Sequence, residues 1–220
     1  LTPVAVLMLL LFAMLFAWIA LSFTSALAGF VSLLANGGRG PALGAGATAP
    51  PRPTARTALL MPCYNENPAK VSAGLHAIWE SLEAAGAADM FDIFVLSDTT
   101  DPLVWIAEEE RFLELRRRTG SARIFYRHRT RNTGRKAGNI ADWVRRWGGA
   151  YPYFLILDAD SVLEARKLLH LAATIQAHPD IGLIQTLPIL TGGATIFARL
   201  HQIAGRIYGQ LIAHGICWWH

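Results

Sequence analysis

Two carboxylates separated by one residue, Asp158 and Asp160, follow the apolar run 154–157. Acids at this spacing at the end of a buried strand can share one hard divalent cation, Mg²⁺ or Mn²⁺, which keeps open positions for phosphate oxygens. The same two acids could instead cap a following helix. The apolar run in front of them favours a metal site at Asp158 and Asp160.

A second polar cluster could bind an anion. Arg135 and Lys136 lie at the start of an expected helix, where backbone N–H groups attract negative charge and a cation adds to that attraction. Residues 115–136 hold many arginines and no acid, a pattern that also fits a solvated basic face or a nucleic-acid surface. The chain has no recognised nucleic-acid-binding motif and a net charge of only +4, so we expect no nucleic-acid partner.

A third group of residues suits a nucleotide. Tyr64 can stack on a base, and the carboxylates of Glu66 and Asp98 can accept hydrogen bonds from ring N–H groups and ribose hydroxyls. Asn65 and Glu66 could instead serve the turn and cap before the next helix. Cys63 has no base placed beside it, so we interpret it as a small packed residue and not as a nucleophile.

A scaffold must bring these residues together, and short apolar runs alternate with stretches of helical spacing from residue 57 onward. The expected strands are 57–61, 91–96, 123–126, 153–157 and 182–186, and the expected helices are 71–85, 103–118, 136–147, 163–177 and 194–213. This alternation predicts an α/β fold with a mostly parallel sheet covered by helices. Ligands of such sheets bind at the carboxyl ends of the strands, and polar groups follow four of the expected strands.

The composition separates an apolar N-terminal segment from a remainder of ordinary composition. Apolar residues make up 53% of the chain and charged residues 16%, with no charged side chain before Arg39. This distribution excludes an intrinsically disordered chain, a disulfide scaffold and a fully soluble protein. Residues 1–35 predict one transmembrane helix, because a bilayer core needs about 20 apolar residues. A signal peptide would have a shorter apolar core after a basic start.

Residues 36–56 are rich in Gly, Pro and Ala and predict a flexible linker. Arg39, Arg52 and Arg56 follow the expected span, and no acid precedes Glu66. An excess of Lys and Arg beside a span marks the cytoplasmic side of the membrane. We therefore expect the α/β domain to be cytosolic.

With these residues in view, the chain resembles the inverting family 2 glycosyltransferases with a GT-A fold, to which cellulose synthase belongs. The strings that carry the resemblance are Pro62-x-Tyr64-Asn65-Glu66, Ser97-Asp98, Arg135-Lys136-Ala137-Gly138-Asn139 and Asp158-Ala159-Asp160. Longer strings between about residues 57 and 188 resemble the members that synthesise osmoregulated periplasmic glucans. The resemblance implies that residues 57–220 form a GT-A domain that is incomplete at its C-terminus.

The resemblance also implies an activity, that of a hexosyltransferase. The donor would be UDP-glucose and the acceptor a growing β-1,2-linked glucan, at the cytosolic face of the bacterial inner membrane. The implied partners besides the lipid bilayer are acyl carrier protein and a periplasmic glucan-modifying protein. The implied substrate-binding residues are Pro62, Tyr64, Asn65, Glu66, Asp98, Arg135, Lys136 and Asn139, with Mg²⁺ or Mn²⁺ at Asp158 and Asp160.

The sequence departs from the family pattern in two ways. Family members place a catalytic base acid after the acid pair, whereas residues 185–220 contain no Asp or Glu. We therefore expect the base beyond His220 and interpret the chain as a fragment. In addition, Ser97 and Asp98 stand where relatives often have two adjacent acids, which leaves open whether Asp98 or Asp101 meets uridine. Two alternatives remain: another processive family 2 synthase, of the cellulose, chitin or hyaluronan type, and a non-catalytic membrane-anchored sugar-nucleotide-binding module.

Overall fold

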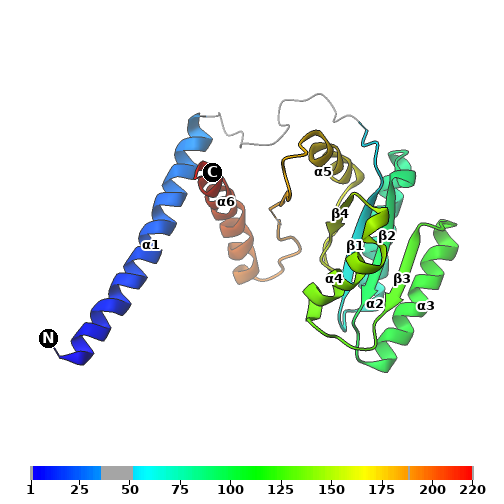
Figure 1. Cartoon of the computed structure of the whole chain (residues 1–220), viewed down its shortest axis with the longest axis horizontal. Helices are drawn as coiled ribbons and strands as arrows, with labels where there is room; N and C mark the ends of the chain where they lie inside the picture. Colours follow the sequence, from blue (N-terminus) through cyan, green and yellow to red (C-terminus); the bar gives the residue numbers. More distant parts are fainter. Residues whose placement is uncertain (1, 36–51, 188, 220) are drawn as a thin grey trace. The chain divides into compact units, whose positions relative to one another are not determined.

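The structure, a computed structural model, describes residues 2–35, 52–187 and 189–219 and divides into two compact units. One unit contains α1 (Pro3–Ala35) and α6 (Ile196–Trp218). The other contains a four-stranded sheet and the helices that connect its strands (Figure 1). This second unit holds all the residues that the sequence singles out for chemistry.

The sheet is parallel throughout, with the strand order β3-β2-β1-β4. Its strands are β1 (Thr57–Cys63), β2 (Phe91–Ser97), β3 (Ile124–His128) and β4 (Tyr153–Ile156). In the register, Cys63 pairs with Ser97 and Ser97 with His128, so the carboxyl ends share one edge. The chain adds β2 and β3 on one side of β1 and β4 on the other, and ligands of open parallel sheets bind where the order reverses in this way.

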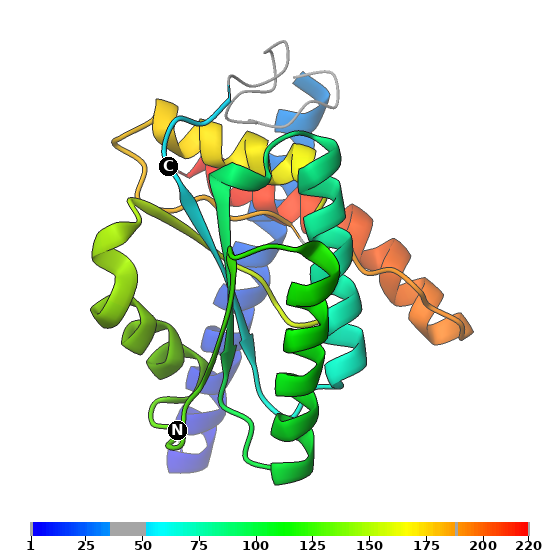
Figure 2. The same ribbon diagram turned by 90° about the vertical axis from the view of Figure 1, so that its right-hand side faces the viewer.

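Helices cover both faces of the sheet, as Figure 2 shows. Three of them pack on one face: α2 (Pro68–Ala84), α3 (Pro102–Thr119) and α5 (Ala165–Ala177). The opposite face is covered by α4 (Arg135–Trp147). Short 3₁₀ turns, η1 (Ala88–Met90) and η2 (Gly148–Ala150), lead into β2 and β4. The α/β fold class expected from the sequence is therefore confirmed.

Side chains along each central strand alternate between two buried cores. In β1, Leu59 and Met61 pack into the core with α2, α3 and α5, whereas Leu60 packs against Trp143 of α4. All four side chains are at most 1% exposed. Successive residues of a strand point to opposite faces, and both faces are covered, which explains why the strands read as continuous apolar runs.

The expected fifth strand, 182–186, is wrong. These residues form no strand, and Leu183 is 82% exposed. Periodicity cannot distinguish a short apolar run that pairs in a sheet from one that does not, because strand stability depends on cross-strand pairing and burial. The run at 182–186 has neither.

The first strand also differs from its expected range, because β1 continues through Pro62 to Cys63 instead of ending at Met61. In a parallel sheet the backbone groups of successive residues point to opposite neighbouring strands, so residues two apart face the same strand. The carbonyl of Leu60 accepts from Leu157 on the β4 side, and that of Cys63 accepts from Asp98 on the β2 side. Position 62 therefore faces the β4 side, where pairing with β4 has already ended at Leu60. Proline, which has no backbone N–H, breaks no hydrogen bond of the sheet there.

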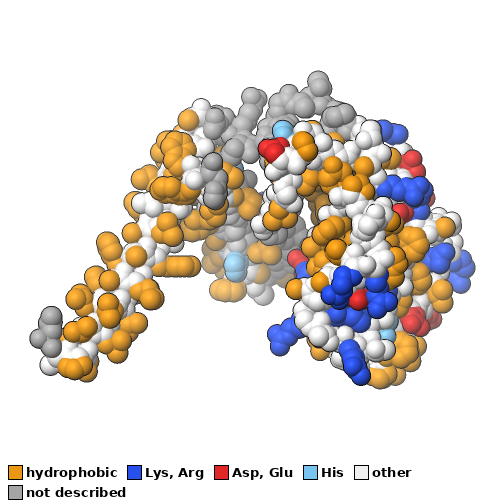
Figure 3. Space-filling model, viewed as in Figure 1, with side chains coloured by type: hydrophobic (Ala, Val, Ile, Leu, Met, Phe, Trp, Pro, Cys, Tyr) orange, Lys and Arg blue, Asp and Glu red, His pale blue; other side chains and the backbone are white. Residues whose placement is uncertain are grey.

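The expected N-terminal helix is confirmed over Pro3–Ala35, and by length and composition it could cross a membrane. Its 33 residues make it about 50 Å long. Figure 3 shows hydrophobic side chains along α1, whereas Lys and Arg side chains gather on the unit that contains the sheet. Within its own unit α6 packs on α1: the Trp219 indole donates to the Ser25 hydroxyl at 3.3 Å, and a Cβ on Gly29 would overlap the Leu211 carbonyl oxygen.

Residues 36–51 of the expected linker lie outside the described residues. Its last part packs on the sheet unit. Arg52 donates to the carbonyl of Gly86 at 3.0 Å, and the N–H of Thr54 donates to the Gln176 side chain at 2.9 Å. Residues just before β1 therefore pack on the sheet unit.

Candidate active site

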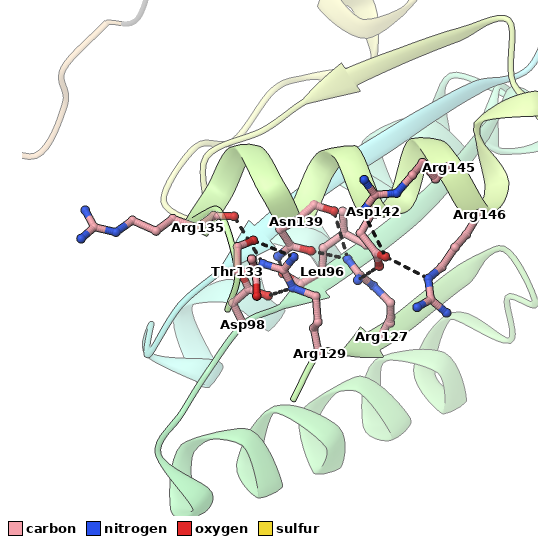
Figure 4. A network of polar contacts seen from close by, with 10 residues as sticks. All are labelled: Leu96, Asp98, Arg127, Arg129, Thr133, Arg135, Asn139, Asp142, Arg145 and Arg146. Atoms are coloured by element: carbon pink, nitrogen blue, oxygen red, sulfur yellow. Dashed lines mark hydrogen bonds and ion pairs between the residues drawn. The ribbon is translucent and has the colours of Figure 1, made fainter. Parts of the chain in front are cut away.

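Polar side chains gather at the carboxyl edge of the sheet, where β1, β2, β3 and β4 all end. The most buried charged pair there joins the loops after β2 and β3. Arg129 donates two hydrogen bonds of 2.7 Å to the two carboxylate oxygens of Asp98 (Figure 4). The Asp98 side chain is 3% exposed and that of Arg129 is 15% exposed. The hydrogen bonds to Asp98 raise the pKa of Arg129 above its ordinary value, so the guanidinium stays charged.

Arg129 also holds the loop that leads into α4. Its guanidinium donates to the backbone carbonyls of Thr133 at 3.1 Å and Arg135 at 3.4 Å. The loop turns through Gly134 and Arg135, both with positive φ (72° and 50°). A Cβ at position 138 would overlap the Thr133 carbonyl oxygen. Only glycine therefore allows α4 to start this close to the loop.

Asn139 lies beneath this loop and is 1% exposed. Its amide nitrogen donates to the Leu96 carbonyl at 2.9 Å, and its amide oxygen accepts from Arg127. Arg127 also donates to Asp142 at 2.5 Å, and Asp142 accepts from Arg146 at 3.1 Å (Figure 4). Both ends of the Asn139 amide are thus used within the protein. Its contacts favour positioning of α4 against β2 over direct contact with a ligand.

The acid pair expected to bind a metal follows β4. Lys136, in the first turn of α4, forms an ion pair with Asp158. The two side chains are 50% and 64% exposed, and Asp160 is exposed beside them without an ion-pair partner among the described residues. A turn closes here with a hydrogen bond from Ser161 N–H to the Asp158 carbonyl at 2.9 Å. Lys136 and Asp158 therefore meet at the carboxyl edge of the sheet, where the strand order reverses.

The chemistry of this acid pair fits a hard divalent cation in part. Two exposed carboxylates two residues apart offer oxygen ligands and leave other positions to water or phosphate. Within residues 2–35, 52–187 and 189–219 no group of three or more His, Cys, Asp or Glu side chains could hold a metal ion by itself. Any cation at Asp158 and Asp160 therefore needs ligands from a bound substrate or solvent.

The turn after β1 is organised around Asn65, which has a positive φ of 53°. Its side-chain oxygen accepts from the N–H groups of Thr100 and Asp101, each at 3.2 Å. The turn and capping interpretation of Asn65 thus agrees with its contacts. Tyr64, 52% exposed, and Glu66 lie on the solvent side of this turn, whereas Pro62 is half-buried in β1.

Both carboxylates considered for uridine already have partners within the protein. Asp98 is paired with Arg129, and Asp101 caps α3 by accepting from the N–H of Leu103 at 2.9 Å. Asp98 is buried at the sheet edge, whereas Asp101 is exposed.

Cys63 is buried at the same edge and has the character of a packed thiol. Burial, and after it the negative charges of Glu108 and Glu66, raise the pKa of Cys63 to about 12. The thiol is therefore protonated at neutral pH, and only a thiolate acts as a nucleophile.

Sequence reasoning missed two residues that organise this edge. Arg129 stands among the polar groups at the end of the third expected strand, but no local pattern identifies it as the arginine that meets Asp98. Glu108 belongs to an expected helix, yet it is 7% exposed. Its spacing from Phe112 and Leu115, four and seven residues on, is that of one helix face and could have revealed that it points inward.

The fold and the strand-end residues define a class of protein, an α/β domain of GT-A type. The sequence profile of glycosyl transferase family 2 matches residues 58–216. The chain therefore belongs to glycosyl transferase family 2, and the resemblance noted in the sequence is confirmed.

Several curated relatives are similar in sequence to almost the whole of this chain, and each is called glucans biosynthesis glucosyltransferase H. The protein of Rhodopseudomonas palustris (strain BisA53) is 56% identical over 213 residues, which cover 96% of this chain and 29% of the relative. That of Xanthomonas campestris pv. campestris (strain B100) is 54% identical over 96% of this chain and 33% of its own length. That of Bradyrhizobium diazoefficiens is 51% identical over 97% of this chain and 28% of its own length. The chain thus spans about a third of the curated relatives it matches.

Proposed function

We propose that this chain is the donor-binding part of an inverting glucosyltransferase that transfers glucose from UDP-glucose to a growing β-1,2-linked glucan. The observation that carries the proposal is identity of 51–56% over almost the whole chain with proteins called glucans biosynthesis glucosyltransferase H. The family match over residues 58–216 supports the same class of reaction.

In the proposed reaction an acceptor hydroxyl attacks the anomeric carbon and UDP leaves from the opposite face. The leaving diphosphate gains negative charge, and Lys136 in the first turn of α4 is suited to neutralise it, because the helix N-terminus adds its own positive potential. Arg135 supplies a second exposed cation beside it. Tyr64, with its exposed ring, and Asp98 are the proposed contacts for the uridine.

Asp158 and Asp160 are the residues that would hold a divalent cation, Mg²⁺ or Mn²⁺. When bound, the cation would supply positive charge to the diphosphate oxygens. The pairing of Lys136 with Asp158 supports this assignment, because it indicates that this carboxylate attracts a cation.

The proposed function is tested with the full-length protein in membrane vesicles supplied with radiolabelled UDP-glucose. We expect incorporation into a glucan that contains 1,2-linkages, and little incorporation from UDP-galactose as the matched donor. A glucan without 1,2-linkages would indicate another processive synthase of the family. Binding of UDP-glucose without any turnover would favour a sugar-nucleotide-binding module.

Because Lys136 pairs with Asp158, substituting Lys136 should change the affinities for UDP and for Mn²⁺ in opposite directions. In the full-length protein, Lys136→Ala should weaken UDP binding about tenfold, the effect of losing one charge-assisted hydrogen bond. The same substitution should strengthen binding of Mn²⁺ alone, because Asp158 loses a competing cation. Calorimetric titrations with UDP and, separately, with Mn²⁺ measure the two affinities. Lys167→Ala, an exposed lysine on α5, is the matched control, and unchanged UDP affinity in Lys136→Ala would remove this lysine from the site.

We also propose that α1 anchors the protein in the bacterial inner membrane with the sheet unit in the cytosol. The apolar helix supports membrane anchoring, and the arginines that follow it support the orientation. A fluorescent protein fused after Arg56 should be fluorescent, and alkaline phosphatase fused at the same position should be inactive. The same reporters behind a cleavable secretory signal serve as the control. An active phosphatase after Arg56 would reverse the proposed topology.

A further inference from the structure

Helix α3 buries an acid, Glu108, directly beneath the end of β2. Three hydroxyl groups donate to its carboxylate. Ser97 and Thr99 each donate at 2.6 Å, to different oxygens, and Tyr126 donates at 3.1 Å. Burying a carboxylate is costly unless hydrogen bonds replace its hydration. The three hydroxyls, two from the β2 end and one from β3, supply that replacement.

The two short hydrogen bonds come from the residues on either side of Asp98. Successive residues of an extended chain point to opposite sides, so Ser97 and Thr99 face α3 while Asp98 faces the loop that holds Arg129. The distances agree with this alternation: both flanking hydroxyls meet Glu108, and both oxygens of Asp98 meet Arg129. Glu108 therefore fixes the positions of the two residues that flank Asp98.

The contacts of Glu108 extend to the turn after β1. The Thr99 hydroxyl that donates to Glu108 also accepts from the N–H of Asn65 at 3.0 Å. Asn65 in turn accepts from the N–H groups of Thr100 and Asp101. The Thr99 carbonyl lies 2.8 Å from His128 Nε2, and the His128 ring stacks on Trp105 of α3 at 5.3 Å. The loops after β1, β2 and β3 are thus joined at Thr99.

A carboxylate suits this position better than an amide would. A carboxylate only accepts hydrogen bonds, so each hydroxyl can donate to it, and the lone pair of Thr99 stays free for the Asn65 N–H. A glutamine would place an NH₂ group against one of the hydroxyl donors. Burial, and also the negative charge of Glu108, raise the pKa of Tyr126, so the Tyr126 hydroxyl keeps the proton that it donates.

We propose that Glu108 is a positioning residue of the nucleotide site, which holds Asp98 and the Tyr64–Glu66 turn in the arrangement that receives the nucleoside of the donor. The inference rests on the proposed function for the identity of that donor. Glu108 itself touches no substrate, since it is buried on the α3 side of the β2 end. It acts through Ser97 and Thr99.

The test compares variants of the full-length enzyme in detergent. Glu108→Gln keeps the shape but replaces one acceptor oxygen by an NH₂ donor, and Thr99→Val keeps the shape but removes the hydroxyl. Each should raise the Kd for UDP and the KM for UDP-glucose about tenfold. The kcat should stay within about threefold of wild type, because the lost contacts serve binding and not the chemical step. Thr99→Ser keeps the hydroxyl and should restore wild-type binding. Glu109→Gln, on the exposed side of α3, is the matched control.

A second measurement needs no nucleotide. Amide hydrogen exchange at Asn65, Thr100 and Asp101 should be faster in Glu108→Gln than in wild type and unchanged in Glu109→Gln. Folded Glu108→Gln and Thr99→Val variants with wild-type UDP affinity would overturn the proposal, as would unchanged exchange at these amides. A wild-type enzyme that binds no UDP would instead refute the proposed function, and the exchange rates would still decide whether Glu108 holds the two loops.

Discussion

Asp158→Asn and Asp160→Asn in the full-length enzyme should each lower glucose incorporation by at least about a hundredfold, because loss of one group that stabilises developing charge costs that much. The fold should tolerate both substitutions. Both side chains are exposed on a turn after β4, and the exposed ion pair of Asp158 with Lys136 contributes at most about 1 kcal/mol. The effect should therefore appear in turnover and not in thermal unfolding.

Two measurements separate a metal role from a general loss of structure. Paramagnetic resonance of bound Mn²⁺ should detect the ion in wild type and not in either variant, while the unfolding temperature stays the same. Asp180→Asn, an exposed acid after α5, is the matched control and should bind Mn²⁺ normally. Turnover close to wild type in either acid variant would contradict the assignment of a cation to this pair.

Arg129→Met should be the most destabilising substitution at the site. It leaves the Asp98 carboxylate, 3% exposed, without its partner, and breaking a buried ion pair in this way costs about 3–5 kcal/mol. The substitution also releases the carbonyls of Thr133 and Arg135, so UDP binding should weaken as well. Thermal or denaturant unfolding of the purified protein measures the first effect, and calorimetry with UDP measures the second.

A second substitution separates the buried charge from the lost contacts. In the double variant Asp98→Asn/Arg129→Met no charge is left unpaired, so the double variant should be more stable than Arg129→Met alone. Arg131→Met, two residues on and exposed, should change stability by no more than about 0.5 kcal/mol. If Arg129→Met unfolds like the Arg131 control, Asp98 and Arg129 do not form the charged pair at the sheet edge.

The two ion pairs lie at different parts of one edge of the sheet. The Lys136 and Asp158 pair is exposed and can exchange its partner for a ligand, whereas the Asp98 and Arg129 pair is buried and keeps its geometry. Glu108 lies behind the buried pair and holds its flanks. In the proposed function, the buried pair lies on the nucleoside side of the donor and the exposed pair on its diphosphate side.

Most of the scaffold was predictable from local patterns. The first four strands and the helices follow from apolar runs and helical spacing. The two central strands, β1 and β2, are buried on both faces, and α2 and α5 each bury one apolar stripe. Pro68 and Pro102 stand at the first helical positions of α2 and α3 after Asn67 and Asp101, which cap them. The run at 182–186 shows the limit of such patterns, because its residues pair with no strand in the part of the chain that the structure describes.

The roles of the polar residues were less predictable. Asp158 and Asp160 could be located at a strand end from the sequence, and so could the loop around Lys136. Local sequence patterns could not show that Asn139 points inward to Leu96 and Arg127. Nor could they show that Arg129, and not a neighbouring arginine, meets Asp98. Each of these pairs joins residues at least a dozen positions apart on different elements.

The sequence by itself determined the helices and the first four strands, their order, and which polar residues stand at the ends of those strands, because side-chain periodicity and turn chemistry act over a few neighbouring residues. The tertiary structure alone decided the partners: Asp98 with Arg129, Glu108 beneath Ser97 and Thr99, and Lys136 with Asp158. The reason is physical. The parallel crossovers bring the start of α4 to the ends of strands that are distant in the chain and fold α3 back over the end of β2, and only there can a buried charge find the groups that compensate it.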